Sequence, residues 1–104
     1  MGKIITYKNE GAKGIFSQIK LDNGERVLIS IATDEIKIFK LKFFGNIPSK
    51  TVWQFSDLYK IAKLFQDNGY DDQLLDVLVE QVKKYNSIED LQKGMDELID
   101  RLKK

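Results

Sequence analysis

The stretch IFSQIKLDNGERVLISI, residues 15–31, decides the fold because it has the pattern of two strands joined by a tight turn. Asn23-Gly24 lies between the two apolar runs, and this pair tolerates the positive φ angles of a type I′ hairpin turn. The first strand has one face made of Ile15, Ser17, Ile19 and Leu21. The second strand has one face made of Val27, Ile29 and Ile31, with Arg26, Leu28, Ser30 and Ala32 opposite. The stretch therefore predicts an antiparallel hairpin.

Further strands are expected on both sides of this hairpin. Residues 3–8 predict a first strand, and residues 51–55 predict a short fifth one after a break at residues 45–49. In the fourth, IKIFKLKFF (residues 36–44), strict alternation would leave neither face cleanly apolar. A β-bulge at Phe39-Lys40 would resolve this by turning inward four apolar side chains, Ile36, Ile38, Leu41 and Phe43. It would also align three lysines in one solvent-facing stripe: Lys37, Lys40 and Lys42.

From residue 56 onward the apolar side chains recur with a period near 3.6, which predicts three helices. Ser56 and Asp57 are suitable caps for the first helix, and Asn68-Gly69 would end it. Asp71 or Asp72 would open a second helix with the apolar stripe Leu74, Leu75, Leu78, Val79, Val82 and Tyr85. Residues 87–90, SIED, fit the capping box of a third helix. Its apolar positions are Ile88, Leu91, Met95, Leu98 and Leu102.

These patterns predict an α+β fold in a single domain, residues 1–104, that is strand-rich over residues 1–55 and helical over residues 56–104. An N-terminal antiparallel meander of four to five strands would be covered by three C-terminal helices. Closure of the meander toward a small barrel is an open alternative.

Composition narrows the chemistry that this chain can perform. Its 104 residues contain no histidine and no cysteine, which excludes Ser-His-Asp and Cys-His catalysis and imidazole- or thiolate-ligated metals. We therefore expect no enzymatic activity and no cofactor. The lack of cysteine and of an N-terminal apolar signal favours the cytoplasm, and no segment has the apolar length of a membrane span, so no membrane partner is expected.

Charge is distributed unevenly along the chain. Residues 1–54 hold nine Lys or Arg and five Asp or Glu, whereas residues 55–104 hold eight and eleven. This asymmetry could steer a polyanion toward the strands, or it could attract the two halves to each other. The second explanation is the simpler one.

Acidic residues cluster where the first helix should give way to the second. Asp67, Asp71, Asp72 and Asp76 superficially resemble a calcium loop, but the sixth position holds Asp72 instead of Gly and the twelfth holds Leu78 instead of Glu. The EF-hand interpretation therefore fails, and no metal site is predicted. A carboxylate enzyme or magnesium site at Asp71, Asp72 and Asp76 is kept only as a third alternative.

Two functional hypotheses remain. The first is a non-catalytic protein–protein interaction or assembly module, with a partner or dimer seam on the third helix formed by Leu91, Met95, Leu98 and Leu102. The same face could instead pack on this chain's own sheet and second helix. The alternative function is weak, sequence-tolerant nucleic-acid binding through Lys37, Lys40, Lys42 and Trp53. Because the chain has only two arginines, it is poor in the side chain that nucleic-acid recognition favours.

Overall fold

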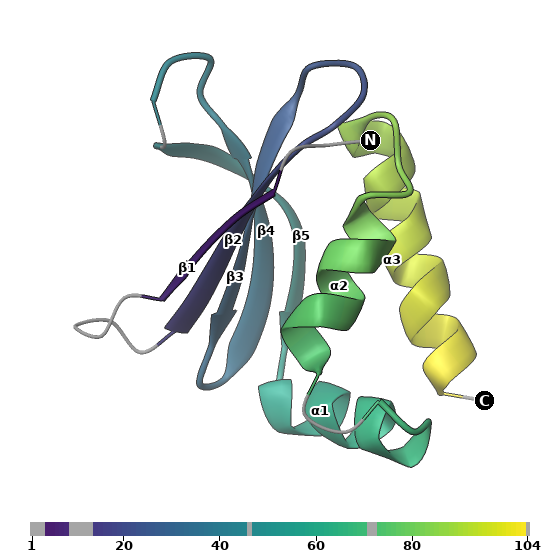
Figure 1. Ribbon diagram of the computed structural model, residues 1–104. Helices are drawn as coiled ribbons and strands as arrows, with labels where there is room; N and C mark the ends of the chain where they lie inside the picture. The colour runs from purple at the N-terminus through teal and green to yellow at the C-terminus, as the bar shows by residue number, and fades with distance from the viewer. Residues whose placement is uncertain (1–3, 9–13, 46, 71–72, 104) are drawn as a thin grey trace.

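The computed structural model describes residues 4–8, 14–45, 47–70 and 73–103, and this part of the chain forms five strands followed by three helices (Figure 1). The strands are β1 (Ile4–Lys8), β2 (Gly14–Lys20), β3 (Arg26–Ala32), β4 (Glu35–Leu41) and β5 (Pro48–Ser56). The helices are α1 (Leu58–Asp67), α2 (Leu74–Val82) and α3 (Ile88–Leu102). The change from strands to helices falls where the apolar spacing changes, so the predicted α+β class is confirmed.

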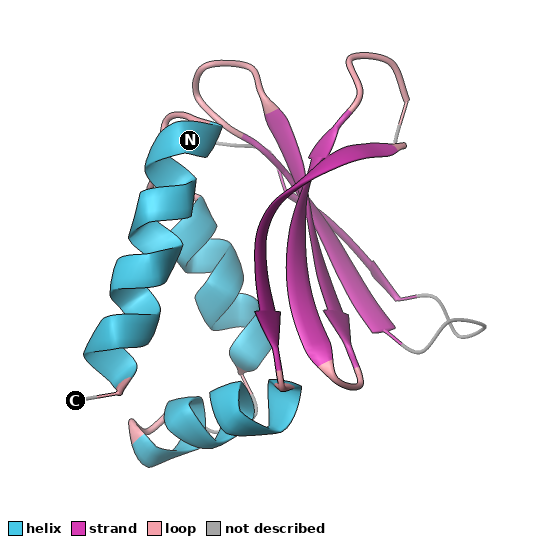
Figure 2. Ribbon diagram, turned by 180° about the vertical axis from the view of Figure 1, so that it is seen from behind, coloured by secondary structure: helices cyan, strands magenta, loops and turns pink. Residues whose placement is uncertain are grey.

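The five strands form one antiparallel sheet in the order β1-β2-β3-β4-β5. All three helices lie on one side of this sheet, as the opposite views in Figures 1 and 2 show, with α1 lying across the lower end of the helical layer. Within the described residues, β1 and β5 pair only with β2 and β4, so both edges of the sheet are open. The predicted meander covered by helices is confirmed, and the alternative of a small barrel is wrong.

The β2–β3 hairpin is present, but its turn is not the type I′ turn expected from Asn23-Gly24. Gly24 has a φ of 90°, whereas Asn23 is not among the described residues with positive φ, and a type I′ turn needs both. The Gly24 N–H donates to the Leu21 carbonyl at 3.0 Å, and the Leu21 N–H donates to the Glu25 carbonyl at 2.7 Å. The Asn23 side-chain oxygen accepts the N–H of Glu25 at 3.0 Å, which fixes the turn from within.

The core lies between the sheet and the helices. Ile29 pairs with Ser17 on β2 and Ile38 on β4, and Ile38 pairs with Trp53 on β5, so a row of side chains crosses the helix-facing side. The helices contribute Ile61 and Phe65 from α1, Leu78, Val79 and Val82 from α2, and Leu91, Met95, Leu98, Ile99 and Leu102 from α3. Sheet and helices therefore share one hydrophobic core.

Local chemistry explains most of the helix ends. The Ser87 hydroxyl accepts the N–H of Asp90 at 3.3 Å, as its capping position predicts. Gly69, with a φ of 86°, follows the end of α1, also as predicted. Asp57 departs from expectation, because its φ of 79° is left-handed and its carboxylate accepts no capping hydrogen bond. Its N–H donates to the carbonyl of Asp34 at 2.7 Å, which joins α1 to the β3–β4 turn.

The start of α2 cannot be assigned to the predicted acids. Asp71 and Asp72 lie outside the described residues, and Gln73 occupies the capping position of the helix. The helix ends at Val82, so Tyr85 is not the last member of its apolar stripe as expected. Tyr85 is instead half-buried between α2 and α3, where its ring packs against the core.

The β4–β5 pairing is irregular near Phe39-Lys40, where a β-bulge was predicted, but the additional residues lie on β5 and not on β4. Register shifts occur between Ile38 and Phe39 and between Lys40 and Leu41, and in both places β5 carries the additional residue. Strand β4 itself pairs with β3 in unbroken register. The bulge predicted on β4 at Phe39-Lys40 is therefore wrong, because the additional residues belong to the edge strand.

This register separates the lysines that the sequence grouped together. Lys40 pairs with Val27, which faces the helices, whereas Lys37 pairs with Ser30 on the opposite face. The single lysine stripe is therefore wrong. Leu41 is buried as predicted but lies outside the main core cluster, and Phe43, which was expected to point inward, is 87% exposed.

Candidate interaction surface

The β4–β5 loop, residues 42–45 and 47 of the described chain, displays three large apolar side chains to solvent. Phe43 is 87% exposed, Phe44 is 81% exposed and Ile47 is 58% exposed. The two phenylalanine rings pack edge to face, with their centroids 4.8 Å apart. Grouped apolar side chains on a surface mark interaction sites, whereas single scattered ones need no explanation. We call this group the apolar tip.

Arg26 holds the loop that carries the apolar tip. Its Nη2 atom donates to the carbonyl oxygens of Lys42 at 2.5 Å, Phe43 at 3.2 Å and Gly45 at 2.8 Å. Gly45 has a φ of 82°, a conformation that glycine adopts without a steric penalty. The Lys42 N–H also donates to the Ile47 carbonyl at 3.0 Å. These bonds hold the main chain at Lys42, Phe43, Gly45 and Ile47, and thereby support the described residues that carry the apolar tip.

A cleft of about 710 Å³ separates the β4–β5 loop from the β2–β3 turn. The two turns project from the same end of the sheet, as Figure 1 shows at the top of the view. The charged side chains lining this basic cleft are Lys20, Arg26, Lys40, Lys42 and Glu25. Phe43 and Leu41 add apolar surface to its wall. Because four of the five charged groups are cations, the cleft favours an anionic ligand.

Glu25 ties the β2–β3 turn to the start of α3. Its Oε1 accepts the backbone N–H of Ile88 at 3.2 Å and a hydrogen bond from the Asn23 amide, and its Oε2 lies 3.8 Å from the Lys40 ammonium. The hydrogen bond from Asn23 contributes most to a lowered pKa of the Glu25 carboxyl, and Ile88 and Lys40 lower this pKa further. The Asn23 N–H also donates to the Asn86 carbonyl at 3.0 Å. One wall of the basic cleft is therefore anchored to the helical layer.

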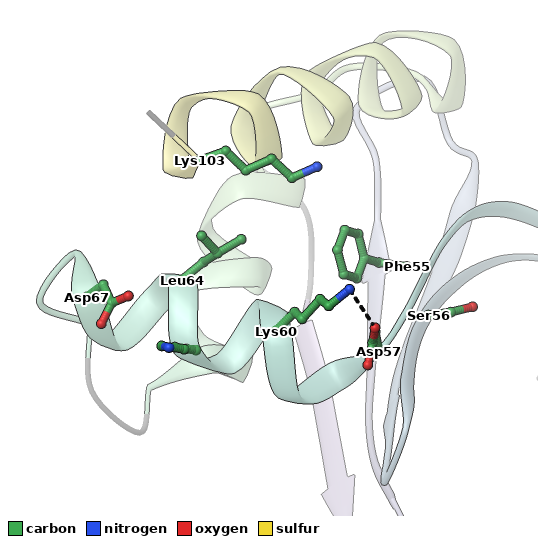
Figure 3. A pocket seen from close by; sticks show the side chains of 8 residues that line it. Phe55, Ser56, Asp57, Lys60, Leu64, Asp67 and Lys103 are labelled. Atoms are coloured by element: carbon green, nitrogen blue, oxygen red, sulfur yellow. Dashed lines mark ion pairs between the residues drawn. The ribbon is translucent and has the colours of Figure 1, made fainter.

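A second hollow, of about 490 Å³, lies where α1, the end of β5 and the end of α3 meet (Figure 3). Phe55 and Leu64 form its apolar floor, and the Lys103 ammonium lies 6.0 Å from the centre of the Phe55 ring. The Lys60 ammonium, which Figure 3 shows beside this floor, is paired with Asp57 at 3.1 Å. The charges around this hollow are mixed, so it has no clear preference for ligand charge.

The proposed seam on α3 is covered by the chain itself. Leu91 and Met95 are fully buried, and Leu98 and Leu102 are 4% and 7% exposed. The structure does bring these four side chains together on one face of α3, but it places that face in the core. Intramolecular packing, the other outcome considered from the sequence, accounts for this apolar face. A partner surface must therefore be sought elsewhere on the molecule.

The four residues considered for nucleic-acid binding do not all lie on one surface. Trp53 is 7% exposed, faces the helices, and donates through Nε1 to the Asp96 carboxylate at 3.0 Å. Lys37 lies on the opposite face of the sheet and pairs with Glu35 at 2.9 Å. Lys40 and Lys42 both line the basic cleft. Two of the four side chains thus meet at one site, without an exposed tryptophan on which a base could stack.

The sequence alone did not identify Phe43, Ile47 or Arg26 as site residues. It assigned the phenylalanines to a continuing strand, although Gly45 and Pro48 indicated a break immediately after them. Apolar residues directly beside such a break were the available signal for an exposed tip. The role of Arg26 depends on its proximity to a loop sixteen residues away, which no local pattern contains.

Within the described residues, no three His, Cys, Asp or Glu side chains gather closely enough to hold a metal ion. Asp71 and Asp72, two members of the predicted acidic cluster, lie outside that part of the chain. The same part has no helix with both the length and the apolar character needed to cross a membrane.

Comparison with known proteins found no match among family models, curated proteins or solved structures.

Proposed function

We propose that this chain is a non-catalytic protein-interaction module that docks through the apolar tip of the β4–β5 loop. The proposal depends on two features that occur in the same loop. The side chains of Phe43 and Phe44 are more than four-fifths exposed, and the Arg26 side chain donates hydrogen bonds to three main-chain carbonyls of the loop. The lack of cysteine makes a reducing compartment such as the cytoplasm its expected location.

Physical chemistry favours a docking role for such a loop. Burying one phenylalanine side chain contributes about 1.5–3 kcal/mol, and aromatic side chains dominate the binding energy of many interfaces. Ordering a flexible loop on binding costs about 0.5–1.5 kcal/mol per immobilised side chain. The Arg26 hydrogen bonds already hold main-chain carbonyls of this loop, so the entropy cost of ordering the main chain on binding is reduced, while the cost of ordering the side chains remains.

Site-specific photocrosslinking tests this proposal. The photoreactive amino acid p-benzoylphenylalanine would replace Phe44 in one version of the full chain and Tyr59 in another. Tyr59 is the matched control, because it is an aromatic side chain with 78% exposure on α1, outside the apolar tip. In cells that produce the chain, position 44 should crosslink to one defined protein and position 59 should not.

The captured protein would then be purified and its binding measured by calorimetry. The double substitution Phe43→Ser with Phe44→Ser should weaken this binding at least tenfold, while Tyr59→Ser leaves it unchanged. Equal crosslinking from positions 44 and 59, or wild-type affinity of the double variant, would contradict the proposal.

A further inference from the structure

Among the residues that the structure describes, the cations of the basic cleft outnumber the acids beside them. Within the described residues, neither Lys20 nor Lys42 forms an ion pair, and Arg26 bonds to carbonyl oxygens, which carry no net charge. Glu25 is the one acid in the lining, and its carboxylate is already shared by Asn23, Ile88 and Lys40. An anionic ligand would therefore find unpaired cations in the cleft.

The shape of this site favours a chain segment over a flat surface. The cations line a hollow of about 710 Å³ between two projecting turns. A bilayer is flat on this scale, so it would contact the projecting apolar tip without filling the hollow between the two turns. A flexible segment of protein can enter the hollow and place its charged groups beside the lysines.

The side chains of the cleft favour carboxylates over nucleic acid. Recognition of single strands relies on exposed aromatic rings for stacking and on arginine for bidentate contacts. Two exposed rings do lie beside the cleft, but Phe43 and Phe44 pack edge to face against each other. Trp53 is buried on the helix side, and the Arg26 guanidinium is occupied by the loop carbonyls, so no arginine of the described cleft lining is left for bidentate contacts. Lysine, a mobile point charge, pairs readily with carboxylates. Phe43 extends the wall of the cleft toward the apolar tip, so the ligand should also carry an apolar side chain.

We infer that the basic cleft binds an acidic segment of the partner protein, with carboxylates among Lys20, Lys40 and Lys42 and an apolar side chain against Phe43. This inference rests on the proposed function, because it names the chemistry of the partner that docks at the apolar tip. The tip supplies apolar burial, and the cleft supplies charge complementarity, which raises the association rate and selects the partner.

The probe is a short fluorescein-labelled peptide of Asp and Glu with two central leucines, and its binding to the full chain is followed by fluorescence anisotropy. Wild type should bind, and binding should weaken as salt rises. The double charge reversal Lys20→Glu with Lys42→Glu should lower the affinity about tenfold or more. Lys84→Glu with Lys93→Glu makes the same change in net charge at exposed positions away from the cleft and should lower it less than twofold.

Three results would overturn the inference: no binding of the peptide by wild type, equal loss in the two double variants, or tighter cleft-dependent binding of an oligothymidylate or of phosphatidylserine vesicles. Urea unfolding of each variant confirms that the exposed substitutions leave the fold intact. The crosslinking experiment at Phe44 does not depend on this peptide. If crosslinking succeeds and the peptide fails, the acidic segment is wrong and the docking role stands; if crosslinking fails, the docking role itself is wrong.

Discussion

The ring of Tyr85 lies directly against the backbone of Gly94 in α3, so that a Cβ atom at position 94 would overlap Cζ and Oη of the tyrosine. Glycine in the middle of a helix costs about 1 kcal/mol relative to alanine. Here it makes room for an aromatic side chain that joins the α2–α3 connection to the last helix. A helix-favouring substitution at this position should therefore be harmful.

We predict that Gly94→Ala lowers the free energy of unfolding by about 1–2 kcal/mol, because displacement of the Tyr85 ring outweighs the gain in helix propensity. Urea denaturation measures the change. In a Tyr85→Ala background the overlap disappears, and Gly94→Ala should then stabilise the protein. A stabilising effect of Gly94→Ala in the wild-type background would show that the ring moves aside without cost.

Tyr85 should also make stability depend on pH at the alkaline end. Burial raises the pKa of the Tyr85 phenol above its ordinary value of 10.0, Arg101 lowers it, and Glu97 raises it. The native state thus holds this proton more tightly than the unfolded state, so stability falls as pH rises above 10. Relative to Tyr85→Phe, wild type should lose stability as pH rises from the ordinary pKa of 10.0 through the raised native pKa. An unchanged difference between the two proteins over this range would contradict the prediction.

Glu25 should make the free energy of unfolding depend on pH at the acid end, where stability should fall as pH is lowered. Its pKa is lowered from 4.5, chiefly by the hydrogen bond from Asn23, so its contribution is present above that value and is lost as pH falls through the native pKa. At pH 7 we expect Glu25→Gln to cost about 0.5–1.5 kcal/mol, the usual contribution of a hydrogen bond. Unfolding at a series of pH values should show the two proteins converging below pH 4. Glu80→Gln, which removes an exposed and therefore weak ion pair with Lys83 on α2, is the control.

Removal of the Arg26 side chain should disorder the β4–β5 loop without unfolding the sheet. Arg26→Ala deletes the hydrogen bonds to the carbonyls of Lys42, Phe43 and Gly45, so these groups would have to be solvated by water. We expect a loss of about 1–2 kcal/mol in stability and faster amide hydrogen exchange in the loop. All three bonds come from the single nitrogen Nη2, so Arg26→Lys, whose ammonium also offers three N–H donors on one nitrogen, should restore part of the loss. If the amides of the loop in Arg26→Ala exchange as slowly as in wild type, the Arg26 hydrogen bonds are not needed to hold the loop.

Asp57 offers a test of backbone strain. It has a φ of 79°, and its ion pair with Lys60 is exposed and therefore weak. Asp57→Gly should raise the free energy of unfolding by roughly 0.5–1 kcal/mol because glycine adopts this conformation freely. Ser56→Gly, one residue earlier in the extended strand β5, should lower it by a similar amount. Destabilisation by both substitutions, measured by thermal unfolding, would show that the Asp57 side chain has a structural role.

Sequence periodicity predicted the main architecture because the deciding interactions are local or repetitive. The alternation around Asn23-Gly24 established the β2–β3 pairing, and the cap at Ser87 established the start of α3. The type of turn was not predictable from the dipeptide, since Asn23 hydrogen-bonds to Glu25 and to Asn86 of the distant helical layer. Local preference was overridden there by a contact between segments far apart in the chain.

The candidate site was less predictable. Both irregularities of the β4–β5 pairing place the additional residue on β5, so β4 keeps strict alternation and Lys37 and Lys40, three residues apart, lie on opposite faces. Which of the two strands would carry the additional residues depends on their pairing and is not contained in the pattern of β4 alone. The apolar stripe of α3 could not be classified as core or interface, because both require the same periodicity. Only the space between α2, α3 and the sheet decides that Leu91 and Met95 are covered.

The guanidinium of Arg26 grips main-chain oxygens, which every amino acid possesses, and not the rings that the loop displays. The shape of the loop is thereby uncoupled from the identity of its outermost side chains. Mutation could exchange Phe43 or Phe44 for other residues while the framework beneath them persists, so the same scaffold could acquire new recognition properties without having to evolve a new fold.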